Sequence, residues 1–277
     1  MRAAGRVARL QRIGDQRRRA GDPVQAEQAY RRALAIAERR LPRGDVATAR
    51  IRNQLGVVLK YTGAFDEAAE LYGQAHGALV RGLGAEHPEV ATVLHNIGGL
   101  CHAAGRPADG EAPARRAVAI RERSLGTDHP DVAADRAALA AILDAMGHHD
   151  EAADLLESAL AIFEATLGPD DHETAVTLSN LGAIDARRGN LQSAERRLRR
   201  ALAIKERTLG TDHIELVPTL GTLGVVCRRR GATRESRELS QRALDLLLSR
   251  GLHSHPQATV LKTNLARLDH TTDVERT

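Results

Sequence analysis

Histidine offers the widest range of chemistry in this sequence, because an imidazole can serve as an acid, a base or a metal ligand. Of the twelve histidines, His95 and His102 lie seven positions apart. That spacing places them on one face of a helix, about 10 Å apart along its axis. If the fold also brings Asp144 to them, the three could perform acid–base catalysis, which needs convergent groups and no linear motif. An acid–base enzyme is therefore one hypothesis for this chain.

The linear motifs of catalysis and metal binding are absent from the sequence. It contains no phosphate-binding G-x4-G-K-[ST], no G-x-S-x-G, no H-E-x-x-H and no cysteine pair at zinc spacing. The adjacent residues His148, His149 and Asp150 rarely converge on one metal without a further element. We therefore expect a protein that is not an enzyme and that needs no metal and no cofactor.

Four other histidines follow a regular spacing. His87, His129, His213 and His255 are separated by multiples of 42 positions. Each stands in a phrase with a proline or an acid, both of which suit the first turn of a helix. We expect these histidines to cap helices at the junctions between repeated units.

A period of 42 residues organises the sequence as a whole. It is marked by glycines at Gly21, Gly63, Gly105, Gly147, Gly189 and Gly231, each followed twelve residues later by an alanine. Such self-similarity is typical of stacked repeats. Cys101 and Cys227 lie three periods apart, too far for a disulfide in such a stack, so we expect buried free thiols.

Each repeat is predicted to contain two antiparallel helices. In the fourth repeat, apolar spacings of three, four and seven indicate one helix from Pro130 to Met146 and a second over about 150–167. Gly147 supplies a left-handed residue between them. Small side chains such as Ala140 allow the helices to approach closely. Because aromatic residues make up only 2% of the chain, Leu, Ile, Val and Ala must fill the core, which favours an all-α fold.

Charge is concentrated at the N-terminal end. Residues 1–42 contain eleven arginines and four acidic residues, although the whole chain has a net charge of only +4. This end could attract an acidic partner or an anionic surface, or it could be a solvated helix face. It could also pair with a second copy, giving a homodimer through the first repeat.

Localisation and partner class follow from what the sequence lacks. No apolar stretch approaches the roughly 18 residues of a membrane span, and the arginine-rich start lacks the pattern of a secretory signal. We expect a cytoplasmic protein without membrane contact. Few aromatic residues are available for stacking, which disfavours nucleic-acid binding.

The repeat resembles a known family. The pattern L-G-x-x-H-P-x-V-A, then N-[LI]-G, then G followed by A-x6-A-[LV] is best seen in Leu83–Ile97 and Leu125–Gly147. It is similar to the 42-residue tetratricopeptide repeats of kinesin light chain and of bacterial regulatory proteins, over about residues 3–270. The resemblance implies an all-α, right-handed superhelical solenoid in one domain. Its expected parts are repeats at about 3–44, 45–86, 87–128, 129–170, 171–212 and 213–254, a capping helix at 255–270, and a flexible tail at 271–277.

The resemblance also implies that the first helix of each repeat lines a concave groove. The groove residues expected on that basis are Arg50, Asn53, Lys60, Tyr61, His95, Asn96, His102, Asp144, Ser179, Asn180, Arg187, Arg228 and Arg229. This groove is polar and mostly basic.

Three asparagines recur at one repeat position of the first helix: Asn96, Asn180 and Asn264. The resemblance implies that they contact the backbone of a ligand, since a carboxamide both donates and accepts hydrogen bonds. Alternatively, they bond to helix ends or to neighbouring repeats.

Three functional hypotheses result. The favoured one is an adaptor or scaffold that binds a peptide segment of a partner protein, with acidic character, in the basic groove. The second is a regulatory receptor that changes its pitch when it senses a peptide, because repeats contact only their neighbours. The third is the acid–base enzyme described above.

Overall fold

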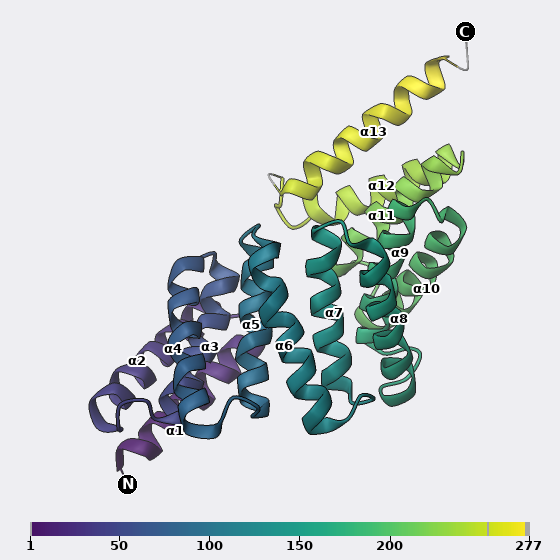
Figure 1. The fold of residues 1–277 in the computed structure, drawn as a ribbon. Helices are drawn as coiled ribbons and strands as arrows, with labels where there is room; N and C mark the ends of the chain where they lie inside the picture. The colour runs from purple at the N-terminus through teal and green to yellow at the C-terminus, as the bar shows by residue number, and fades with distance from the viewer. Residues whose placement is uncertain (1, 254, 275–277) are drawn as a thin grey trace. The chain divides into compact units, whose positions relative to one another are not determined.

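The computed structural model describes residues 2–253 and 255–274, and the side chains of residues 4–253 and 255–268. Within these ranges the chain forms helices and no strand, which confirms the all-α prediction (Figure 1). The chain divides into two compact units, unit 1 ending at His148 and unit 2 starting at His149.

Unit 1 contains the helices of the first three repeats and the first helix of the fourth. Its described helices are α1 (Arg2–Arg19), α2 (Pro23–Arg40), α3 (Val46–Thr62), α4 (Phe65–Leu83), α5 (Pro88–Ala103), α6 (Pro107–Leu125) and α7 (Pro130–Ala145). We call α1, α3, α5 and α7 A helices and the second helix of each repeat a B helix. Within unit 1, each A helix packs on the B helices beside it, and α5 also contacts α3 and α7.

Unit 2 continues the same alternation. Its described helices are α8 (His149–Thr166), α9 (His172–Arg188), α10 (Leu191–Leu209), the 3-10 turn η1 (Ile214–Leu216), α11 (Val217–Arg229), α12 (Thr233–Leu248) and α13 (Pro256–Val274). Here α9 and α11 are the A helices, and α13 packs on α12 and α11. The helix α13 includes residues 271–274, which the sequence analysis assigned to a tail; residues 275–277 lie outside the described residues.

Glycines end the helices as predicted. Gly147 has φ = 86°, and Gly63 and Gly189, which cap α3 and α9, have φ = 83° and 85°. These values lie in the left-handed region that a residue with a Cβ atom avoids. The predicted 42-residue glycine positions therefore lie at the C-terminal ends of the A helices, at the C-cap or just after it.

Close helix packing depends on a glycine in the A helix facing a large residue of the B helix. A Cβ atom added to Gly56 of α3 would lie 2.6 Å from Cε1 of Tyr72 in α4, and Tyr72 is fully buried. In unit 2, Gly182 and Leu198 stand in the same relationship at 2.6 Å. The prediction of small residues at the interface is confirmed, but two tyrosines, Tyr30 and Tyr72, fill core positions that we expected aliphatic residues to occupy.

The junction histidines cap helices, as predicted. The backbone N–H of Glu89 donates to Nδ1 of His87 over 3.2 Å, and His129, His213 and His255 accept equivalent bonds over 3.1, 3.3 and 3.3 Å. In the fifth repeat the carboxylate of Asp171 takes this role at 2.8 Å. Each cap satisfies one N–H group that the helix leaves unpaired.

Both cysteines are free. Cys227 is buried as expected, whereas Cys101 is only half-buried, and burial raises the pKa of both thiols. In the described part of the chain, no helix combines the length and the apolar character of a membrane span.

Candidate functional site

The A helices of unit 1 carry a chain of polar contacts from repeat to repeat. The side chain of Asn96 in α5 donates a hydrogen bond from Nδ2 to Oδ1 of Asn53 in α3 over 2.8 Å. Asn53 is buried, so this bond satisfies a group that water does not reach. The pair joins two neighbouring repeats, as one of our two interpretations of the recurrent asparagines expected.

Arg50 of α3 forms a bidentate ion pair with Glu89 of α5. Its Nε and Nη2 atoms each lie 2.6 Å from a Glu89 carboxylate oxygen. The Arg50 guanidinium therefore holds the pKa of Glu89 below its usual value. Beside the pair lies a pocket of about 300 Å³, also lined by Asn53, Thr92 and Asp15. The positive charge expected from Arg50 is thus balanced within the protein.

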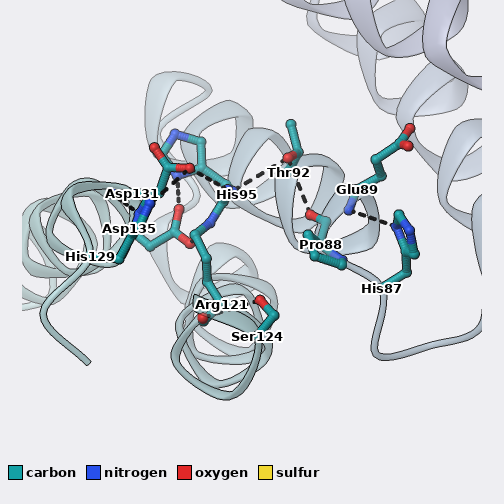
Figure 2. A network of polar contacts seen from close by, with 10 residues as sticks. All are labelled: His87, Pro88, Glu89, Thr92, His95, Arg121, Ser124, His129, Asp131 and Asp135. Atoms are coloured by element: carbon teal, nitrogen blue, oxygen red, sulfur yellow. Dashed lines mark hydrogen bonds and ion pairs between the residues drawn. The ribbon is translucent and has the colours of Figure 1, made fainter. Parts of the chain in front are cut away.

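His95 belongs to a network that spans three helices (Figure 2). Its Nδ1 atom lies 2.8 Å from Oδ1 of Asp135 in α7, and the other carboxylate oxygen of Asp135 accepts a bond from Nε of Arg121 in α6 over 2.6 Å. Asp135 is only 2% exposed. Arg121 also reaches Thr92 and Asp131, each over 3.4 Å. A buried ion pair thus fixes the orientation of a partly exposed imidazole.

In unit 2, the residues at the repeat positions of His95, Arg121 and Asp135 form a second network. Ser179 of α9 lies 3.0 Å from the hydroxyl of Thr219 in α11, and Nζ of Lys205 in α10 donates to that hydroxyl over 3.1 Å. Each residue stands 84 positions after its counterpart in the His95 network. Lys205 is buried, which lowers its pKa. These contacts join the fifth and sixth repeats.

Sequence reasoning missed Asp135, Arg121, Thr219 and Lys205. A signal was available for Asp135, because its counterparts in other repeats, Val93, Thr177 and Thr219, are uncharged. A charged residue at a core repeat position requires a buried partner.

Lys60 and Tyr61, at the end of α3, are placed differently from Arg50. The Nζ atom of Lys60 lies 5.2 Å from the ring centre of Tyr61, a cation–π contact. Lys60 is half-buried, burial lowers its pKa, and no described carboxylate pairs with it. Tyr61 is 75% exposed. Lys60 and Tyr61, which we call the Lys60–Tyr61 corner, therefore present a cation and an aromatic ring at the end of α3. No described acidic side chain pairs with the cation.

The other expected residues lie apart from these networks. His102 is exposed on α5, and Asp144 of α7 is half-buried. The structure pairs His95 with Asp135, an acid that the acid–base hypothesis did not include. Among the described residues, no three His, Cys, Asp or Glu side chains cluster as metal ligands.

The expected residues of unit 2 include three arginines. Asn180 and Arg187 are exposed on α9, and Arg228 of α11 is half-buried, with an Nε atom that finds no hydrogen-bond partner among the described residues. Arg229 donates from Nη1 to the backbone carbonyl of Ala186. The arginines thus lie on α9 and α11, the two A helices of this unit.

Comparison with solved structures shows the fold in other proteins. BtubC (BKLC) from P. vanneervenii is 20% identical, with a TM-score of 0.64, over 91% of this chain and 93% of its own. A kinesin light chain-type protein from Podosopora anserina with nearly identical TPR-like repeats is 24% identical, with a TM-score of 0.61, over 74% of this chain and 98% of its own.

A Rap protein complexed with competence and sporulation factor is 14% identical, with a TM-score of 0.65, over 93% of this chain and 73% of that protein. No curated protein is significantly similar in sequence. The tetratricopeptide repeat model matches residues 6–79, 89–165, 154–207 and 173–249, most of the length. This match and the two-helix repeats of both units show that the chain belongs to the tetratricopeptide repeat family.

Proposed function

We propose that this chain is a non-enzymatic adaptor that binds a peptide segment of a partner protein on its A helices. The observation that carries the proposal is the corner formed by Lys60 and Tyr61. A half-buried ammonium group without an acidic partner is costly, and a carboxylate from a bound segment would offset that cost.

The surrounding contacts support a preformed surface. The Arg50–Glu89 pair and the Asn96–Asn53 bond hold α3 and α5 in a fixed register. The helix that carries Tyr61 is therefore already in place before a partner binds, so binding need not order its backbone. The family, and the likeness in fold to the Rap protein complexed with competence and sporulation factor, are consistent with this proposal.

Selection from a peptide library tests the proposal. Random peptides of about twelve residues, which extend to about 40 Å, are selected against the full chain, and the affinity of labelled winners is measured by fluorescence anisotropy. Lys60→Ala and Tyr61→Ala should each weaken binding by about tenfold or more, as expected for anchor residues.

Arg32→Ala provides the control. Arg32 is an exposed arginine on the B helix α2, so its loss removes charge without touching the A helices. If the Lys60 and Tyr61 variants bind as tightly as the wild type, or if Arg32→Ala weakens binding equally, the A-helix assignment is wrong.

A further inference from the structure

Unit 2 contains an apolar pocket between α9, α11 and α13, which we call the α13 pocket. Its volume is about 330 Å³, and its apolar lining includes Val217, Pro218, Val225 and Leu261. This volume lies at the small end of the range for ligand sites. The pocket is therefore suited to one or two side chains.

The guanidinium of Arg229 gives the rim of the α13 pocket a positive charge. Arg187 also lines the pocket, and no Asp or Glu among the described residues does. Arg229 donates one bond to the Ala186 carbonyl, and no described carboxylate pairs with it. Its remaining N–H groups can donate to an incoming acid, and a guanidinium matches a carboxylate in geometry.

The helix α13 contributes more than a cap. Its residues Gln257 and Asn264, seven positions apart, both line the pocket, and so does Val260, which is 58% exposed. Carboxamide side chains can pair with the N–H and C=O groups of a peptide backbone. The pocket thus combines an apolar floor, backbone-pairing groups and cations.

We propose that the α13 pocket anchors an acidic partner segment, which inserts one aliphatic side chain and sets its carboxylates against the rim, above all against Arg229. This inference rests on the proposed peptide-binding function and names a second contact point with its own chemistry. Charge complementarity selects the partner, because a neutral apolar segment would leave Arg229 without a counter-charge.

A designed probe tests the pocket directly. The probe is a fluorescein-labelled Gly-Ser-Asp-Leu-Asp-Ser-Gly peptide, titrated against the full chain by anisotropy. Saturable binding is expected, and replacing Leu by Ser, or both Asp by Asn, should weaken it by about tenfold, because each change removes one anchor. Binding should also weaken as salt rises.

Two variants of the chain complete the test. Ala183 lines the pocket, so Ala183→Phe should fill it and weaken binding by about tenfold or more, and Arg229→Gln should weaken binding and reduce its salt dependence. The controls are Ala141→Phe, at the equivalent position of α7, and Arg234→Gln, whose side chain is 94% exposed. Circular dichroism melts check that each variant is folded.

The outcomes separate the two proposals. Absence of saturable binding, an unaffected Ala183→Phe, or equal weakening by Ala141→Phe would overturn the pocket assignment. If the probe does not bind and light scattering gives twice the mass of one chain, we would assign the pocket to contact with a second copy of the chain. That result would also overturn the proposal. If library-selected peptides depend on Tyr61 but not on Ala183, peptide binding stands and the α13 pocket proposal fails.

Discussion

Nδ1 of His95 lies 2.8 Å from the buried carboxylate of Asp135, and 84 residues later Ser179 lies 3.0 Å from Thr219 at the same two repeat positions. A cationic side chain on a B helix, Arg121 or Lys205, bonds to the second member in both cases. The two networks differ in charge. The first contains the Arg121–Asp135 ion pair, whereas in the second the ammonium group of Lys205 bonds to the uncharged hydroxyl of Thr219. Both join the A helices of successive repeats.

Replacing Asp135 should destabilise unit 1. In Asp135→Ala the largely buried guanidinium of Arg121 loses its nearer counter-charge and keeps only Asp131 at 3.4 Å, which we expect to cost about 3 kcal/mol of unfolding free energy. Urea unfolding followed by circular dichroism measures this loss.

Unit 2 suggests the matched control for this variant. The triple exchange of His95→Ser, Arg121→Lys and Asp135→Thr copies the network of Ser179, Lys205 and Thr219. It should cost less than Asp135→Ala alone, because the buried cation regains a partner. If the triple variant were the less stable of the two, the equivalence of the networks would be refuted.

Gly56 should not tolerate a side chain. Its Cβ atom would lie 2.6 Å from the ring of the buried Tyr72, so Gly56→Ala should lose about 1–3 kcal/mol of stability by overpacking. Thermal and urea unfolding report the change.

Gly73, an exposed glycine in α4, is the matched control. A Cβ atom there meets nothing within 4 Å, so Gly73→Ala should stabilise the protein by about 0.5–1 kcal/mol. Equal effects of the two substitutions would contradict the packing account.

Glu89 should make the free energy of unfolding depend on pH in the acid range. Because Arg50 lowers its pKa in the folded state, the unfolded state binds more protons between the two pKa values. The stabilisation is therefore fully present above the unfolded pKa of about 4.3 and is lost as pH falls through the lower folded-state value.

The comparison of wild type with Glu89→Gln isolates this effect. Their difference in urea midpoint should be largest near neutral pH and should shrink towards about pH 2. Arg50→Gln should remove the same pH dependence. A difference that stayed constant with pH would exclude the ion pair as its source.

A junction histidine should be replaceable by aspartate. The Nδ1 atom of His129 accepts the N–H of Asp131, and Asp171 performs this role for α9. His129→Ala should cost about 1 kcal/mol, the usual value of a lost N-cap, whereas His129→Asp should keep the stability. The urea midpoints of the wild type, His129→Ala and His129→Asp measure these stabilities. An equal loss of stability in both variants would contradict the capping role of His129.

Much of the fold could be predicted because its signals are local. Gly147 and its equivalents end helices through their own backbone conformation, and His129 caps the helix that begins beside it. Apolar spacing predicted a helix from Pro130 to Met146, and α7 of the structure spans Pro130–Ala145, one residue shorter. Such features act over a few residues and recur in each repeat.

The partners of the candidate site residues could not be predicted in the same way. Arg50 and Glu89 lie 39 positions apart, and His95 and Asp135 lie 40 apart. Each pair depends on how one repeat is rotated against the next, which the spacing within a single repeat does not specify. The expectation of a mostly basic groove overlooked the balancing of Arg50 by Glu89 for this reason.

The sequence by itself determined the period, the two helices of each repeat and their caps, because these follow from backbone conformation and apolar spacing over short distances. Only the tertiary structure decided which charges are balanced, as in the Arg121–Asp135 pair, and which stay available, as at Lys60. The reason is that burial and ion pairing are properties of the packed repeats and depend on side chains that lie far apart in the chain.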